Sequence, residues 1–402
     1  MKSDKTTPNV PTLRFREFTD GWMLMPLKKL LCFQNGINAD SDKYGKGVKF
    51  ISVSDILNNQ YITYDCIKGM IDIDEKTMEK FLVEYGDMLF QRSSETFEDI
   101  GRANVYLDKE HPATFGGFVI RGKKISEYNP LFFRYLLCTP NARKQTVRMG
   151  AGAQHYNIGQ DGLGKISLYF PAIQEQQKIA AFLSAIDDRI AVQNKIISKY
   201  ETLIKGIYHE FFSKPADYAI KIKDLIIKGK AGGTPSSTVA RYYNGDIPFL
   251  SISDMTKQGK YVSHTEKHIS ESGIEDSSAW IVPSNSLIFS MYASVGLVCI
   301  NTVPLATSQA MFSMVLKDYR MIEYIYYYLN FFRDTKIHRH IETGTQSNIN
   351  AETVRNIEIP FQSNHSKLVE TLNSIEKRLN NEKDMLSLLV DLKAYLLSKL
   401  FI

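Results

Sequence analysis

Two segments of the chain carry the same long pattern of apolar positions. Across residues 179–211, apolar side chains recur in alternating steps of four and three residues, except where Gln193 interrupts. Across residues 368–400 the same steps return at a constant offset of 189 residues (368 minus 179), with interruptions at Glu382 and Lys393. Sustained heptads with polar residues between them predict long helices, each with one coiled-coil seam.

The two helices are expected over 174–212 and 363–401, each about 58 Å long at 1.5 Å per residue. Because the seams match in length within one chain, we expect them to pack on each other. Periodicity alone does not decide between a parallel and an antiparallel pair. Gln193 and Glu382 lie near the helix midpoints, where an antiparallel pair would bring them together and fix the register. The alternative is that both are solvated breaks in the seam.

The remainder of the chain also repeats. Residues 48–56 (VKFISVSDI) return as residues 247–255 (IPFLSISDM), 199 residues later. A Gly-x-Gln pair that begins at Gly152 returns at Gly344, 192 residues later. The order of the matches is kept and the offset drifts slowly, which indicates two copies of one unit of about 190 residues, within the usual size of a domain.

Each copy contains strand and helix signals in alternation. The predicted strands are rich in β-branched and aromatic residues and are separated by Gly, Pro and Asn turns. We expect strands at 49–53, 87–91, 118–121, 249–252, 287–291 and 295–300, and buried helices at 130–137 and 321–332. Tyr324, Tyr326, Tyr327 and Tyr328 are expected to pack in a core; a base-stacking surface is the alternative, but no basic residues are interleaved with them.

These patterns predict an α+β protein with two similar mixed α/β domains related by internal duplication. The domains are separated by two long helices packed as an antiparallel coiled coil. The predicted limits are a leader at 1–21, a first domain at 22–173, a first helix at 174–215, a second domain at 216–362 and a second helix at 363–402.

Composition and charge narrow the function. Of 402 residues, 44% are hydrophobic and 23% charged, as in globular domains. Residues 22–173 carry 19 basic and 17 acidic side chains and residues 216–362 carry 14 of each, so any nucleic-acid contact must come from one face of a domain. No apolar run suits a membrane span or a secretory signal, which predicts a cytoplasmic protein without a membrane partner.

The sequence contains no recognisable catalytic motif. The sequence has no Walker A loop and no G-x-G-x-x-G, and the four cysteines are too far apart in sequence to form a metal or disulfide motif. His264 and His268 have the outer spacing of a zinc-protease motif, but no Glu follows the first histidine, so no metal site is expected. The chain is therefore predicted to be a binding protein and not an enzyme.

Several motifs taken together resemble the specificity (S) subunit of type I restriction-modification enzymes. They include a leader-like opening at 11–18 with Trp22, the run 242–249 (YYNGDIPF), SISD at 251–254, GTQSNI at 344–349, and a closing heptad helix. The motif GGTPS at 232–236 belongs to the same set. The resemblance covers essentially the whole chain.

The resemblance implies that each domain is a target-recognition domain that reads one half of a split double-stranded DNA target, while the helices set the gap between the halves. It implies two modification (methyltransferase) subunits, which hold S-adenosylmethionine and methylate adenine, and restriction subunits that use ATP and Mg. No cofactor is expected in this chain. The first copy lacks GGTPS and has a Gly-x-Gln loop one residue longer, so the target is expected to be asymmetric.

Loops at strand ends supply the donors and acceptors that base edges need. Arg92, Gln154, Gln346 and Asn348 are the predicted base readers, and turn-forming polar groups are the alternative for each. The wider set is Gln91, Ser93, Ser94, His155 and Tyr156 in the first domain, and Ser290, Tyr292, Ser294, Thr345 and Ser347 in the second.

Basic residues stand just before each glycine loop. Predicted phosphate contacts are Arg143, Lys144 and Arg148 in the first copy and Lys336, Arg339 and His340 in the second, with a solvated helix face as the alternative. Two other functions remain open at this point: a coiled-coil scaffold without DNA readout, and a self-contained methyltransferase or nuclease.

Overall fold

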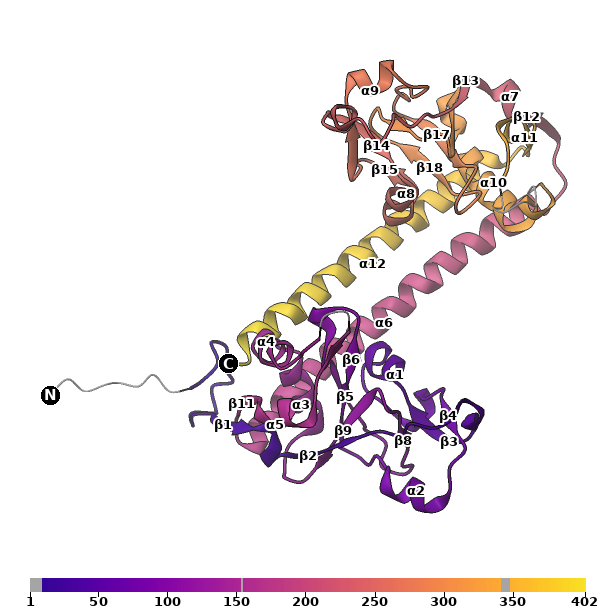
Figure 1. Cartoon of the computed structure of the whole chain (residues 1–402). Coiled ribbons are helices and arrows are strands. Elements are labelled where there is room, and N and C mark those ends of the chain that lie inside the picture. The colour runs from indigo at the N-terminus through magenta and orange to yellow at the C-terminus, as the bar shows by residue number, and fades with distance from the viewer. Residues whose placement is uncertain (1–8, 153–154, 341–347) are drawn as a thin grey trace. The chain divides into compact units, whose positions relative to one another are not determined.

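The computed structural model describes residues 9–152, 155–340 and 348–402, and these divide into two compact units (Figure 1). Unit 1 comprises the chain up to Lys195 together with 384–402, and unit 2 comprises 196–383. Each unit therefore combines one globular block with half of each long helix, whereas the predicted domain limits treat the helices as separate segments.

Unit 1 contains short helices packed around strands that pair mostly antiparallel, apart from the parallel pair β3 and β8. Its strands are β1 (Met23–Pro26), β2 (Leu31–Asn35), β3 (Tyr44–Ile51), β4 (Met70–Ile71), β5 (Met88–Gln91), β6 (Ser93–Ser94), β7 (Ala103–Val105), β8 (Thr114–Phe115), β9 (Val119–Lys124), β10 (Tyr156–Asn157) and β11 (Ser167–Phe170). Its helices are α1 (Val53–Asn58), α2 (Glu75–Lys80), α3 (Pro130–Leu137), α4 (Pro140–Arg148), α5 (Gln160–Lys165) and the first part of α6 (Ile173–Phe212).

Unit 2 repeats this order of elements. Its strands are β12 (Tyr218–Lys221), β13 (Ile226–Ala231), β14 (Ile247–Leu250), β15 (Tyr261–Val262), β16 (Lys267–Ile269), β17 (Ser286–Ser290), β18 (Val298–Asn301), β19 (Ala306–Thr307), β20 (Met311–Leu316) and β21 (Glu358–Phe361). Its helices are the end of α6, α7 (Ile222–Leu225), α8 (Ile252–Gln258), α9 (Glu271–Glu275), α10 (Ile322–Thr335), α11 (Ala351–Arg355) and the first part of α12 (His365–Lys399).

Sheet topology confirms that the two blocks are copies of one fold. Unit 1 has a four-stranded sheet in the order β2-β9-β5-β7, and unit 2 has the corresponding strands β13-β20-β17-β18 with β15 added at the edge. Unit 1 also has a three-stranded sheet β4-β3-β8, which corresponds to β16-β14-β19. Within these sheets, Phe50 pairs in parallel with Thr114, and Phe249 pairs in parallel with Ala306.

The repeated Ser-x-x-Asp motif ends a strand and starts a helix in both copies. Ser52 N donates to Asp55 Oδ2 at 2.8 Å, and Ser251 N donates to Asp254 Oδ2 at 2.9 Å, as in a capping box. The strands predicted at 49–53 and 249–252 therefore end at Ile51 and Leu250, because the capping box turns the next residues into helix.

The predicted long helices are α6 and α12. Within unit 2 they run antiparallel: Gln362 Nε2 donates to Phe211 O at 3.0 Å, and Lys383, further along α12, pairs at 2.9 Å with Glu201, which lies earlier in α6. Gln193 in unit 1 is buried, with 1% of its surface exposed, and Glu382 in unit 2 is half-buried. Their role in setting the register stays a prediction.

A polar interruption of the second heptad pattern has a partner in unit 1. Lys393 forms an ion pair with Asp187, and Tyr135 OH of α3 donates to the other oxygen of the same carboxylate at 2.7 Å. A third element, the leader, packs on the same helices: Leu13 N donates to Lys399 O at 2.9 Å, and Arg14 pairs with Glu175 at 2.8 Å.

The tyrosine run lies in the core of unit 2, as predicted. Tyr324, Tyr327 and Tyr328 are at most 3% exposed, and Tyr326 is partly buried against the same cluster. Across the described ranges, no helix has the length and apolar character needed to cross a membrane.

Candidate nucleic-acid interface

In unit 1, the loop after β5 lies directly beside the end of the glycine loop. Ile158 N donates to Arg92 O at 3.0 Å, and Arg92 N donates to Phe118 O at 2.9 Å. The short strands β6 and β10 pair Ser94 with Tyr156. Residues far apart in sequence, 91–94 and 155–157, therefore form one continuous surface.

Side chains on this surface hold its shape through polar contacts. Ser93 Oγ donates to Asn157 Oδ1 at 2.5 Å, and Arg92 Nη1 donates to Gly117 O at 3.2 Å. Tyr156 packs edge-on against Phe97, with 5.2 Å between ring centroids. Arg92, Ser93 and Ser94 are half-buried and His155 is exposed, so this surface presents polar groups to solvent from a constrained backbone.

Unit 2 makes the same main-chain contact between its corresponding loops. Ile349 N donates to Met291 O at 3.1 Å, and Met291 N donates to Ala310 O at 2.7 Å. Asn348, next to Ile349, is half-buried. Tyr292 is 38% exposed and Ser294 is exposed. The two domains therefore build the same pair of loops and present different side chains from it.

Ser290 has a loop-forming role that the sequence did not reveal. It is fully buried, its hydroxyl donates to Ser294 O at 2.7 Å, and the same oxygen accepts from Leu297 N at 3.1 Å. These bonds close the turn in which Ala293 and Ser294 have φ of 43° and 64°. The Ser290 hydroxyl is thus used within its own loop, and the DNA contact predicted at Ser290 stays a prediction.

The three predicted phosphate contacts of unit 1 differ in whether their side chains are already hydrogen-bonded within the protein. Arg143 Nη2 donates to Glu98 O at 2.8 Å and to Ile100 O at 2.7 Å, and burial lowers the pKa of its guanidinium. It therefore braces the 3-10 helix η4 (Phe97–Asp99) beside the loop. Lys144 and Arg148, on the same helix α4, are exposed and suited to a phosphate.

Acidic groups also lie near this surface. A hydrogen bond from the Thr96 hydroxyl and a second one from Arg102 lower the pKa of Asp99. The carboxylate is thus ionised and already paired at neutral pH. Since Glu95 is also exposed here, the immediate surroundings of residues 91–94 favour neutral donors over phosphates.

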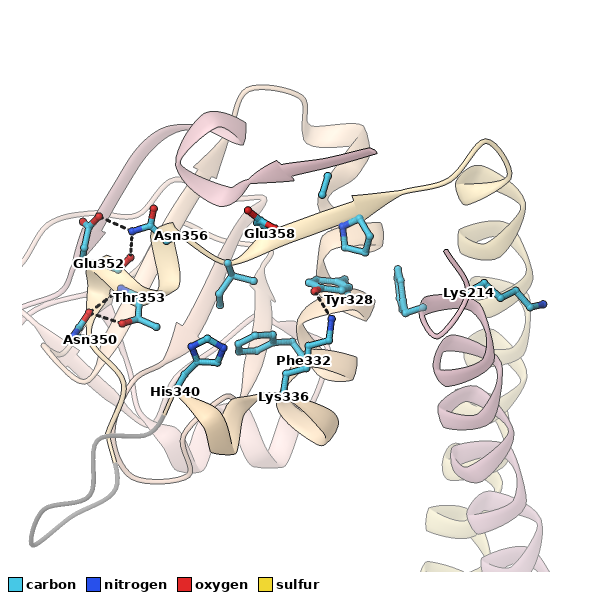
Figure 2. A pocket seen from close by; sticks show the side chains of 14 residues that line it. Lys214, Tyr328, Phe332, Lys336, His340, Asn350, Glu352, Thr353, Asn356 and Glu358 are labelled. Carbon is cyan, nitrogen blue, oxygen red and sulfur yellow. Dashed lines mark hydrogen bonds between the residues drawn. The ribbon is translucent and has the colours of Figure 1, made fainter. Parts of the chain in front are cut away.

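Two of the three predicted phosphate contacts of unit 2, Lys336 and His340, line a cavity of about 690 Å³ (Figure 2). Lys336 Nζ lies 3.4 Å from Tyr328 OH, and the His340 ring lies 5.3 Å from that of Phe332. Figure 2 shows Lys336 and His340 on the side of the cavity nearest the end of α10. Arg339, in the 3-10 helix η7 (Ile337–Arg339), is exposed.

Four predicted DNA-contact residues, Gln154, Thr345, Gln346 and Ser347, lie outside the described residues. Their roles stay predictions, as does that of Asn348. The sequence pattern missed two apolar side chains at the unit 1 surface, Phe118 and Leu57, which are 69% and 45% exposed. The sequence signal that could have indicated Phe118 is the Gly116-Gly117 pair directly before it, because a glycine pair is typical of a turn.

The fold and these surfaces define a class: a duplicated protein whose two domains build the same pair of adjoining loops. Among the described residues, no group of three or more His, Cys, Asp or Glu side chains is placed to hold a metal ion. A comparison with known proteins identifies the class further.

The family model described as "Type I restriction modification DNA specificity domain" matches the chain twice, over residues 20–202 and 217–385. Because these matches cover most of the chain, the protein belongs to this family. It is a DNA target-recognition subunit of a type I restriction-modification system, with two recognition domains, and is not itself an enzyme.

Curated relatives agree with this assignment. The HindI specificity subunit of Haemophilus influenzae is 24% identical over 84% of this chain and 92% of its own length. The MjaIX specificity subunit of Methanocaldococcus jannaschii is 28% identical over 193 residues, a match that spans 47% of this chain and 44% of that protein.

Solved structures share the fold. The type I S subunit from M. genitalium matches with a TM-score of 0.56 at 14% identity, over 98% of this chain and 99% of that one. A chain from a study of assembly and conformational transition in the type I R-M system matches with a TM-score of 0.59 at 13% identity, over 96% and 98%. These likenesses support the fold, and the double match to the family model confirms the expected duplication and recognition function.

Proposed function

We propose that each domain reads one half of an asymmetric, bipartite DNA target through its pair of adjoining loops. The supporting observation is the main-chain bond from Ile158 to Arg92, which recurs as the bond from Ile349 to Met291. Equivalent backbones hold different side chains at the reading surface, so the two half-sites differ. Basic residues next to the loops contact phosphates and position the loops without reading sequence. They are the exposed Lys144, Arg148, Arg339 and His340 and the half-buried Lys336.

Single substitutions in one loop should alter only one half of the target. Arg92→Ala is expected to relax base preference in one half-site, by about 1–3 kcal/mol at the affected base pair, while the other half and the gap stay unchanged. Asn348→Ala should relax the other half alone. Sequencing the methylated adenines of cells that carry the variant together with its modification and restriction subunits measures both effects.

Lys76→Ala is a charge-matched control for Arg92→Ala, because it also removes one positive charge from the first domain, at an exposed position in α2 and outside the loops. It should leave the methylated sequence unchanged. If Arg92→Ala and Asn348→Ala both leave the target unchanged in assembled complexes, the loops are not the reading surface.

We further propose that the long helices dock modification subunits, and one face of α12 in unit 1 supports this. Met385, Leu388, Leu392 and Tyr395 are 44–64% exposed and follow steps of three, four and three residues, the spacing of knobs for a second helix. The corresponding positions of α6, 189 residues earlier, are Ile196, Lys199, Leu203 and Gly206, so the stripe is broken at two of its four positions: Lys199 stands in place of Leu388 and Gly206 in place of Tyr395. The two docking positions are therefore unequal.

Leu388→Glu should weaken assembly with the modification subunit at least tenfold, because it places a charge in the centre of the apolar stripe. Ser387→Glu adds the same charge at the adjacent, exposed position and should have little effect. Titration of the modification subunit onto the full chain, followed by light scattering, measures both affinities. Equal affinities for the two variants would exclude the stripe as a docking surface.

A further inference from the structure

A cavity of about 450 Å³ opens beside the end of β5 in unit 1. Its lining combines hydroxyl and carboxylate groups with two exposed apolar side chains. The lining residues are Leu57, Gln91, Ser93, Ser94, Glu95, Thr96, Asp99, Phe118 and His155. It therefore lies on the surface assigned above to DNA reading.

Among the described residues that line the cavity, Gln91 is the one with a buried side-chain atom that lacks a hydrogen-bond partner. Its side chain is buried, with 6% exposed, and its Nε2 donates to Ser93 O at 2.9 Å. A main-chain carbonyl only accepts, so this bond fixes the orientation of the amide and makes Oε1 the free acceptor. Oε1 is buried and has no partner within the described part of the chain. A buried acceptor of this kind indicates a missing donor.

The other lining groups narrow the kind of donor. Phe118 and Leu57 form apolar walls, and Asp99 is already bonded to Thr96 and Arg102. Glu95 is exposed, and no Lys or Arg is among the lining residues. A phosphate finds no strong cation here, whereas a flat, neutral group that carries an N–H donor fits both the walls and the acceptor.

We propose that this cavity receives the major-groove edge of one base pair of the first domain's half-site. Gln91 Oε1 accepts a hydrogen bond from an exocyclic amino group, N6 of adenine or N4 of cytosine. Thymine O4 and guanine O6 are acceptors at the corresponding position, so they are rejected. The inference rests on the proposed function and adds the chemical group that is read.

The second domain lacks this subsite. The residue that corresponds to Gln91 is Ser290, whose hydroxyl is used within its own loop. The residue that corresponds to Phe118 is Ala310, as the matching bonds to Met291 N and Arg92 N show. Amino-group recognition by a buried amide is thus confined to the first domain, which gives one physical source for the asymmetry of the target.

The test is a double-mutant cycle between the protein and single base groups. After the target has been determined by sequencing methylated DNA, the assembled complex is titrated with synthetic duplexes. In each duplex, one adenine of the first half-site is replaced by purine or one cytosine by 2-pyrimidinone, which deletes the amino group. At one position the wild-type complex should bind about tenfold more weakly, and Gln91→Leu should show less than a twofold change.

An equal loss in the wild type and in Gln91→Leu at every position would overturn the inference. If Arg92→Ala alters the half-site in the same experiment, the proposed function still stands; if it does not, the loop assignment fails as well. Should Gln91→Leu not assemble, Phe118→Ala decides, because Phe118 is 69% exposed and its removal leaves the core intact. It should relax base preference within the first half-site, and an unchanged preference at all of its base pairs would overturn the inference.

Discussion

Asp87→Ser is expected to lower the free energy of unfolding of unit 1 by about 3–5 kcal/mol, because the buried guanidinium of Arg121 loses its paired carboxylate and keeps only the exposed carboxylate of Glu84, 3.8 Å away. Asp87 and Arg121 are 2% and 4% exposed, and the carboxylate accepts from Arg121 Nε and Nη2 at 2.7 Å each. It also accepts from Glu84 N and Lys124 N at 2.9 Å. Four donors would therefore lose their acceptor at once.

The second copy of the fold supplies the matched control. At the positions of Asp87 and Arg121 it carries Ser286 and Ser313, both fully buried. The double variant Asp87→Ser/Arg121→Ser reproduces that pair, so it should cost much less than Asp87→Ser alone. A residual loss of about 1–2 kcal/mol is expected, since Glu84 N and Lys124 N both lose the carboxylate that accepts from them. In the second copy the residue at the position of Glu84 is Pro283, which has no N–H to satisfy.

Each unit contains one of the two tryptophans, so the unfolding of unit 1 can be followed separately within the full chain. Trp22 is 3% exposed in the core of unit 1, and Trp280 is 8% exposed in unit 2. Urea unfolding of the full chain in a Trp280→Phe background then reports on unit 1 alone through Trp22 fluorescence. A double variant as unstable as Asp87→Ser would show that the charge pair is not the reason for the loss.

The elements that the sequence predicted best are those governed by periodicity. The heptads of α6 and α12 and the helix at 130–137 follow from spacing and from the Asn-Pro start of α3. The duplication is visible because Phe50 and Phe249, with the Ser-x-x-Asp motifs after them, keep both identity and order. Local chemistry and repeat order are properties of the sequence itself.

Features that depend on tertiary partners were beyond sequence reasoning. Lys393 breaks a heptad, yet its partner Asp187 lies 206 residues away in the chain. Nothing local marks Ser290 as a loop-closing residue or Gln91 as a buried acceptor. Gln91 and Ser290 end corresponding strands, β5 and β17. Only the packing around them shows that the Ser290 hydroxyl closes a loop, whereas the amide oxygen of Gln91 has no partner among the described residues.

The second large effect is expected at Lys260, which joins the second recognition domain to α12. Its ammonium group lies 2.7 Å from Glu376 and 3.3 Å from Glu323, and it donates to Tyr327 OH at 2.8 Å and Asn373 Oδ1 at 3.1 Å. Its side chain is 9% exposed. Lys260→Met removes the only cation that contacts both carboxylates among the described residues and should cost unit 2 about 3–5 kcal/mol.

Removing one of the two carboxylates as well should restore part of this loss. Lys260→Met/Glu376→Gln leaves Glu323 with donors from Tyr261 and Asn373, so less negative charge stays uncompensated. Unfolding followed by Trp280 fluorescence in a Trp22→Phe background measures both variants. A double variant less stable than Lys260→Met would exclude charge repulsion as the cause.

Unit 1 has a comparable anchor that predicts a smaller effect. Lys393 pairs with one carboxylate, that of Asp187, and its side chain is 24% exposed. When Lys393 is removed, the Asp187 carboxylate still accepts the hydrogen bond from Tyr135 OH. Lys393→Met should therefore lower the free energy of unfolding of unit 1 by about 1–3 kcal/mol.

Because Lys260 fixes β15 and α10 to α12, its loss should also loosen the contact between the second domain and α12. Under the proposed function, Lys260→Met should then widen the range of gap lengths that are methylated, and an unchanged gap with a destabilised unit 2 would show that the anchor stabilises the domain without setting the spacing.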